Sequence, residues 1–217
     1  PGAYDLIVYG FDSGNTVVSG MKGFYDALAS TERYKDADTL SYNAPDHLMV
    51  ARDTNFVIPL MYDRDEPVYF YEYPHTIMDT WCIVINGIRG LGNAVSMDIY
   101  VTGQSRSNNF GPGVLSDKET TIHVPVAADL QNSRIYTPFC TFGKLPGHAS
   151  RLRLVIRDPN QKTFILYADV TDQFDDPEND GHWIVLNFDL EIEAKKDGGM
   201  MPDVNQWNDN TFVYDIH

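Results

Sequence analysis

The chain has 217 residues, which is enough for one large β domain or two small ones. Its formal net charge of −15 argues against binding to nucleic acid or directly to an anionic membrane surface, because both depend on Lys and Arg. Aromatic residues reach 12%, with 13 Tyr and 11 Phe, and these side chains favour strands. No apolar run approaches the roughly 20 residues that a membrane-spanning helix needs.

The first part of the chain contains short apolar runs separated by turn residues. Residues 4–11 and 16–18 predict the two strands of a hairpin, because the turn between them contains Gly and Asn. Apolar residues within residues 23–30 recur at i, i+3 and i+4, which predicts a short helix, the one helix that we expect. Residues 56–60 and 68–73 predict two further strands.

Beyond residue 79 the strands become longer and alternate between apolar and polar residues. In the longest run, residues 184–193, Leu186 and Phe188 share the apolar face. The same alternation covers residues 95–102, 122–126 and 152–157, and residues 158–160 predict a tight turn after the last of these. A period of two indicates one buried face and one wet face, as in antiparallel sandwich sheets.

Several short strands with regular turns predict an all-β fold of two β-sandwich domains, with one short helix in the first. The predicted strands become longer and more regular around residues 74–79, so we place the boundary between the two domains there. The predicted domains are residues 1–76 and residues 77–217.

The sequence contains no motif for catalysis, cofactor binding or metal binding. The nucleophile elbow, the zinc-protease motif, the phosphate-binding loop and the CxxC pair are all absent. We interpret Cys82 and Cys140 as two buried thiols that act as small apolar residues, in preference to a single disulfide. Six histidines lack ligand spacing and are interpreted as surface or strand residues: His47, His75, His123, His148, His182 and His217. We therefore expect no catalytic residue, no cofactor and no metal.

An acidic cluster occupies residues 172–180. Calcium takes six to eight oxygen ligands, so such a segment could bind it. The spacing differs from that of the EF-hand, and Pro177 interrupts the cluster. We favour a solvated acidic connector.

Tyr69, Tyr71 and Tyr73 alternate within the predicted strand at residues 68–73 and would share one face. Aromatic faces stack on flat ligands, so this face could bind sugars or peptides. The alternative, which we favour, is packing between sheets or between the two domains.

The end of the chain has the most distinctive pattern. A glycine pair at residues 198–199 leads to Pro-Asp-Val, then to a Trp followed by Asn and Asp, and finally to an alternating strand at residues 211–216. This pattern resembles the end of fimbrillin-related surface lipoproteins of anaerobic Gram-negative gut and oral bacteria, in an uncharacterised branch near the fimbrial anchors. Further short pieces resemble the same superfamily: residues 2–9, 43–46, 139–143 and 168–173.

The resemblance implies two tandem Greek-key, transthyretin-like β-sandwich domains without catalytic residues. It implies export to the cell surface or outer membrane, with a lipid-bearing Cys on the precursor. No Cys precedes Cys82, so this lipid-bearing Cys lies upstream of Pro1 or is absent. Because the chain begins without Met or a signal-like segment, we interpret it as trimmed or processed.

Two functions are compatible with these observations. The first is a non-catalytic fimbrial subunit, anchor or adhesin, with other fimbrial or surface proteins as partners and no nucleic acid. The alternative is a carbohydrate-binding surface module, which would use the Tyr69, Tyr71 and Tyr73 face to bind host or bacterial surface glycans.

The final strand connects the sequence to assembly. Phe212, Tyr214 and Ile216 alternate with Val213 and Asp215, so the strand has one apolar face. A terminal strand of this kind either seals the core of its own chain or is donated to a neighbour as an assembly strand. We favour the seal for the isolated chain.

Overall fold

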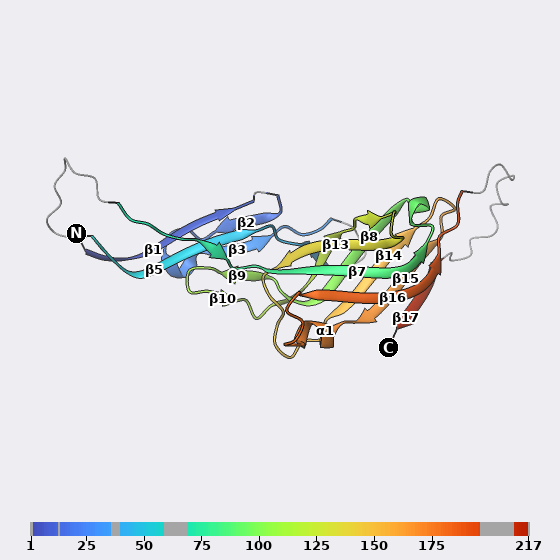
Figure 1. The fold of residues 1–217 in the computed structure, drawn as a ribbon. Coiled ribbons are helices and arrows are strands. Elements are labelled where there is room, and N and C mark those ends of the chain that lie inside the picture. Colours follow the sequence, from blue (N-terminus) through green and yellow to red (C-terminus); the bar gives the residue numbers. More distant parts are fainter. Residues whose placement is uncertain (1, 13, 36–39, 59–68, 196–210, 217) are drawn as a thin grey trace.

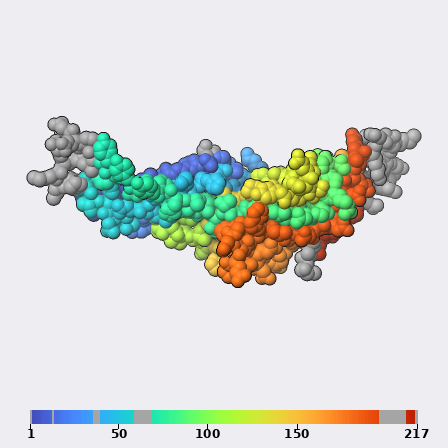
Figure 2. All heavy atoms as spheres, in the orientation of Figure 1, coloured from blue at the N-terminus to red at the C-terminus, as the bar shows by residue number. Residues whose placement is uncertain are grey.

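The computed structural model describes residues 2–12, 14–35, 40–58, 69–195 and 211–216. The chain is mostly β, and its described residues form four sheets in an elongated molecule (Figure 1). The N-terminal strands lie at one end, and the later strands fill the other end (Figure 2). None of the helices in the described ranges is long and apolar enough to cross a membrane.

Two sheets form the end of the molecule that contains the N-terminus. The first has the order β1 (Gly2–Phe11), β5 (Leu48–Ile58) and β6 (His75–Thr76). The second has the order β10 (Val114–Leu115), β9 (Ser107–Asn109), β3 (Leu28–Thr31) and β2 (Thr16–Ser19). We call these two sheets the N-terminal sheet pair.

The other two sheets form the C-terminal sheet pair. The six-stranded sheet has the order β17 (Thr211–Ile216), β15 (Thr163–Asp169), β14 (Arg151–Arg157), β8 (Ser96–Ser105), β11 (Glu119–Pro125) and β4 (Ser41–Asn43). The four-stranded sheet has the order β12 (Ala128–Asp129), β13 (Arg134–Thr141), β7 (Asp79–Arg89) and β16 (Trp183–Glu191). The described helices are short: η1 (Phe24–Asp26), η2 (Leu91–Asn93) and α1 (Thr171–Asp175).

Each sheet pair has its own hydrophobic core. In the N-terminal pair, Leu48 and Val50 of β5 pack with Phe110, which lies between β9 and β10. In the C-terminal pair, Ile83 of β7 and Leu154 of β14 are fully buried in a larger core to which both sheets contribute. Burying each such side chain stabilises the fold by about 1.5–3 kcal/mol, so these two cores hold the sheets together.

Strand pairing crosses the predicted domain boundary, between residues 76 and 77, in two places. β9 and β10 follow that boundary in sequence, yet β9 pairs with β3 in the N-terminal sheet pair. β4 precedes the boundary, yet it pairs in parallel with β11 in the C-terminal sheet pair. The two sheet pairs therefore exchange strands, and the division into two domains stays a proposal.

The strands predicted in the C-terminal half are confirmed as β8, β11, β14 and β16, but strict alternation of burial holds only in β16. Tyr100 and Val155, predicted on wet faces, are buried, and Val95, predicted on an apolar face, is 69% exposed. Every second residue of β16 is buried, and Leu186 and Phe188 share the inward face as predicted. The tight turn at residues 158–160 is also confirmed, between antiparallel β14 and β15. There the buried Asp158 accepts hydrogen bonds from the backbone N–H groups of Asn160 and Lys162, each at 2.8 Å.

The helix predicted over residues 23–30 is wrong. Only Phe24–Asp26 turns as a 3-10 helix, and Leu28–Thr31 forms β3, in which Ala29 and Thr31 are buried. β3 pairs with β2 on one side and β9 on the other, and two ladders outweigh a single helical turn, whose nucleation is costly. The one α-helix of the described residues is α1, in the C-terminal half.

The hairpin predicted for residues 4–18 is also wrong, because β1 pairs with β5 and β2 pairs with β3. The carboxylate of Asp46 accounts for why β1 and β2 do not pair with each other. It accepts hydrogen bonds from the backbone N–H groups of Asn15 and Thr16, so the turn is held by a distant segment rather than by its own strands.

Candidate functional site

The three tyrosines of the predicted ligand face lie in an irregular segment rather than a strand. Tyr69, Tyr71 and Tyr73 are 71%, 76% and 82% exposed, so the expectation that they pack between sheets or domains is wrong. The predicted strand at residues 68–73 is wrong for the described residues 69–73, and residue 68 lies outside them. Phe70 contacts the ring of Phe56 in β5, with the centroids 4.5 Å apart, and anchors the segment. Outside a strand, alternation no longer places the three rings on one face.

The predicted assembly strand is β17, at one edge of the six-stranded sheet. It pairs in parallel with β15, so that Phe212 lies beside Phe164 and Tyr214 beside Leu166. The rings of Phe212 and Phe164 stack with centroids 5.5 Å apart. The apolar face of β17 thus continues the inward face of β15, although Phe212 and Tyr214 stay 44% and 40% exposed.

Strand formation at the chain end is therefore confirmed, and β17 covers the edge of the core only in part. Ile216 pairs with Ala168 through its backbone, and its side chain lies outside the described residues. Whether the strand serves as an assembly strand stays a prediction. The Gly-Gly, Pro-Asp-Val and Trp pattern before β17 also lies outside the described residues.

The acidic segment at residues 172–180 begins as α1 and continues as a surface loop. Lys144 forms an ion pair with Asp175 at 2.6 Å, and Asp176 accepts a hydrogen bond from the backbone N–H of Glu178. Asn179 donates to the carbonyls of Gln173 and Trp183, which closes the loop onto β16. In the described ranges, no group of three or more His, Cys, Asp or Glu side chains is placed to hold a metal ion.

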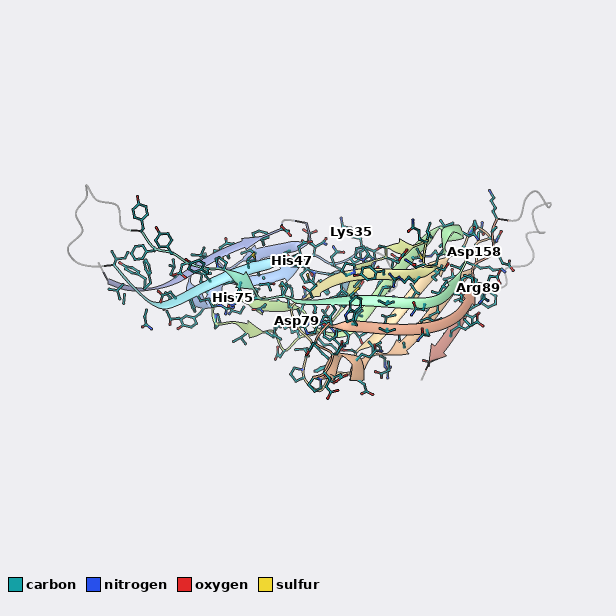
Figure 3. The ribbon with its side chains drawn as sticks, in the orientation of Figure 1. Lys35, His47, His75, Asp79, Arg89 and Asp158 are labelled. Atoms are coloured by element: carbon teal, nitrogen blue, oxygen red, sulfur yellow. The ribbon has the colours of Figure 1, made fainter. Side chains whose placement is uncertain are left out.

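A thiol and an imidazole meet between the two sheet pairs. The Sγ of Cys140 lies 3.8 Å from Nδ1 of His47 and 3.6 Å from Oγ1 of Thr80. Figure 3 labels His47 in this middle region of the molecule. Burial raises the pKa of the Cys140 thiol, whereas nucleophilic catalysis needs a lowered thiol pKa and an accessible sulfur. These surroundings favour the neutral thiol, so they give no support for a catalytic dyad.

Both cysteines are buried free thiols. Burial also raises the pKa of the Cys82 thiol, and a hydrogen bond with Tyr136 opposes that rise. The interpretation of the two cysteines as small apolar residues agrees with these surroundings.

The surface has a groove that was not predicted from the sequence. The groove, of about 590 Å³, lies near β4 and the start of β11. Its polar and aromatic lining includes Tyr42, Arg106, Lys118, Glu119, Thr120 and Thr121. These residues come from three separate segments, so no local motif could have predicted the groove.

No protein-family model matches the chain, and no curated protein matches it in sequence. A solved structure of a proposed adhesin from Bacteroides ovatus aligns with it at a TM-score of 0.64 and 15% identity, over 90% of this chain and 76% of that chain. The chain is similar in fold to that adhesin. The resemblance to bacterial adhesion proteins inferred from the sequence is therefore confirmed as a structural similarity, at low sequence identity.

Two further structures align at lower scores. The fimbrial anchor protein Mfa2 from Porphyromonas gingivalis has a TM-score of 0.48 and 13% identity, over 86% of this chain and 67% of that chain. A proposed polysaccharide-binding protein from Bacteroides thetaiotaomicron has a TM-score of 0.42 and 13% identity, over 76% of this chain and 58% of that chain.

Proposed function

We propose that the chain is a non-catalytic cell-surface protein that acts as a fimbrial subunit, an anchor or an adhesin. The observation that carries this proposal is its similarity in fold, across 90% of its length, to a proposed adhesin. The molecule is elongated (Figure 2), and its edge strands β1 and β17 expose apolar side chains such as Phe11 and Phe212, which suits contact with other macromolecules. Two transthyretin-like domains, divided near residue 76, belong to the same proposal.

The proposal includes a location and partners. We place the protein at the outer membrane, held by a lipid anchor upstream of Pro1, with other fimbrial or surface proteins as its partners. In this setting the net charge of −15 favours solubility outside the cell over association with anionic surfaces.

β17 is the proposed assembly strand. A strand at a sheet edge can leave its own sheet and pair with the edge of a neighbour, where it regains the backbone ladder. Phe212 and Tyr214 project on the same side of β17 and are half-exposed, so both are available to a neighbouring groove. Val213 projects on the opposite side and is 63% exposed, which makes it a matched control.

The experiment uses the complete gene in the bacterium that carries it. Whole-cell antibody labelling should detect the protein at the surface, and deletion of the gene should reduce fimbriation or adhesion. Cells with Phe212→Ala and Tyr214→Ala should show the same loss, whereas Val213→Ala should behave as wild type. Retention inside the cell, or unchanged fimbriation and adhesion in the deletion strain, would contradict the proposal.

A carbohydrate-binding module is the second candidate function. The observation that favours it is the exposure of Tyr69, Tyr71 and Tyr73, each above 70%. Exposed aromatic rings stack on the apolar faces of sugar rings. A glycan array with the triple Tyr→Ala variant tests it, and Tyr25→Ala, at a position 68% exposed elsewhere on the protein, is the control. Loss of one glycan class in the triple variant alone supports this function, and identical array patterns contradict it.

A further inference from the structure

The groove near β4 and the start of β11 is lined by two positively charged residues, Arg106 and Lys118. The backbone N–H of Arg106 donates to the carbonyl of Lys118 at 3.0 Å, so the backbones of the two residues are neighbours. Both side chains line the groove and are exposed. Its volume of about 590 Å³ is within the range of small-molecule sites.

These two cations lack ion-pair partners among the described residues. Arg89, Arg134, Lys144, Arg157 and Lys162 each pair with a carboxylate. Arg106 and Lys118 form no such pair within the described ranges, although the chain carries 31 acidic residues against 16 basic ones. Two neighbouring cations without a carboxylate partner among the described residues attract an anionic ligand even in an acidic protein.

The guanidinium of Arg106 is held in position by an aromatic ring. Its Cζ lies 4.1 Å from the ring centroid of Tyr42, which is 8% exposed and fixed by the pairing of β4 with β11. The cation–π attraction to the ring holds the guanidinium at the groove. A guanidinium can bind a carboxylate through two parallel hydrogen bonds.

The rest of the lining has no further cation and includes the exposed side chain of Leu40 as well as polar residues. Glu119 is fixed at both oxygens, by the backbone N–H of Gly103 at 3.2 Å and by Nδ1 of His148 at 3.0 Å. Thr121 and the largely buried Thr120 also line the groove. A single carboxylate among hydroxyls can accept hydrogen bonds from a polyol.

We propose that this groove binds an acidic saccharide, through a sugar residue that carries one carboxylate. Arg106 and Lys118 bind the carboxylate, while Glu119 and the threonine hydroxyls bind sugar hydroxyls. An acidic peptide fits less well, because its further carboxylates would meet Glu119. The inference rests on the proposed adhesive function and names the ligand class of that function.

The experiment is titration calorimetry on the whole chain with four probes. The acidic probes are methyl glucuronide and 3′-sialyllactose, which carry one carboxylate each, and the neutral probes are methyl glucoside and lactose. We expect at least one acidic probe to bind at least about tenfold more tightly than its neutral counterpart. Binding should weaken as NaCl rises from 50 to 500 mM, since salt screens the attraction.

Variants locate the site. Arg106→Gln with Lys118→Gln should weaken binding of the acidic probe at least tenfold. Lys22→Gln with Lys195→Gln removes the same charge from two other exposed positions and should leave the affinity unchanged. Arg106→Lys keeps the charge but loses the paired hydrogen bonds, so it should give an intermediate affinity. Melting curves establish that each variant is folded.

Several results would overturn the inference. The first is that neither acidic probe binds, and the second is that the neutral probes bind as tightly as the acidic ones. The third is that the groove variant and the control variant lose the same affinity, and the fourth is that a polyglutamate peptide binds more tightly than the acidic saccharides. Surface exposure and adhesion of whole cells test the proposed function separately. If cells adhere but the purified protein binds neither acidic probe, the proposal of an acidic saccharide ligand is wrong and the proposed adhesive function stands.

Discussion

Phe188 illustrates how much stability depends on a single inward residue. It lies on β16 with Leu186 on the same face, 9% and 8% exposed, within the core of the C-terminal sheet pair. Phe188→Ala should lower the free energy of unfolding by about 3–5 kcal/mol, because the surrounding side chains cannot fill the cavity. Urea denaturation measures this loss. Val185→Ala, at a position 45% exposed on the other face, should cost far less. Equal effects would mean that the register of β16 is wrong.

A second single residue, Cys140, makes the free energy of unfolding depend on pH in the alkaline range. Burial raises the pKa of its thiol above the ordinary value of 9.0, and the charges of Asp46 and Asp12 add to that rise. A raised folded-state pKa contributes stability that is fully present below the unfolded pKa and is lost as pH rises through the folded pKa. The native protein should therefore lose stability above about pH 9.

Cys140→Ala isolates this contribution, because alanine does not titrate. Melting temperatures from pH 7 to pH 10.5 should fall more steeply for the wild type than for the variant. Parallel curves would mean that the thiol pKa is the same in the folded and unfolded states.

At the scale of elements, β17 is joined to the molecule by its ladder to β15 and by one aromatic contact. Phe212→Ala removes the stacking on Phe164 and should lower the free energy of unfolding by about 1–2 kcal/mol. Val213→Ala changes an exposed side chain and should stay within about 0.5 kcal/mol of wild type. Equal effects of the two substitutions would show that β17 contributes through its backbone alone.

Deleting the whole strand is the stronger test. Removal of residues 210–217 should lower the melting temperature or cause aggregation, because the edge of β15 and part of Phe164 become exposed. Added peptide with the sequence of residues 211–217 should restore stability. A truncated monomer with an unchanged melting temperature would remove the support for β17 as a seal or an assembly strand.

The elements also show what sequence patterns can and cannot predict. β16 was predictable, because it has one buried and one wet face and its period of two is unbroken. β14 was predictable as a strand, although Val155 on its predicted wet face is also buried. β3 was not, since the spacing of Phe24, Ala27 and Leu28 fits a helix as well as a 3-10 turn followed by a strand. The partners of β1 and β2 were not predictable either, because Asp46 sets them from a distance in sequence.

Some features of the candidate sites could be predicted from the sequence and others could not. A strand at Phe212 and Tyr214 was predictable from local alternation. The exposure of Tyr69, Tyr71 and Tyr73 was not, because an aromatic run in the sequence gives no sign of its surroundings. The groove required three segments to meet, and Tyr42, Arg106 and Lys118 carry no shared pattern in the sequence.

At the scale of the whole molecule, the exchanged strands connect the two sheet pairs. A fragment of residues 77–217 would lack β4, which covers β11, and would lack β2, β3 and β5, which cover Phe110 and Phe142. We expect this fragment to aggregate or to melt well below the complete chain in calorimetry. A fragment with the melting temperature of the complete chain would establish the C-terminal part as an independent domain.

The antiparallel pairing of β1 and β5 has a mechanical consequence. The ladder extends from Gly2 opposite Ile58 to Phe11 opposite Leu48, and β1 runs along the long axis of the molecule (Figure 1). Hydrogen bonds in such a ladder are perpendicular to the strands. Tension applied along the axis therefore shears all of these bonds at once, whereas a sideways pull would unzip them one after another. We therefore expect this ladder to resist tension best along the direction in which the molecule is longest.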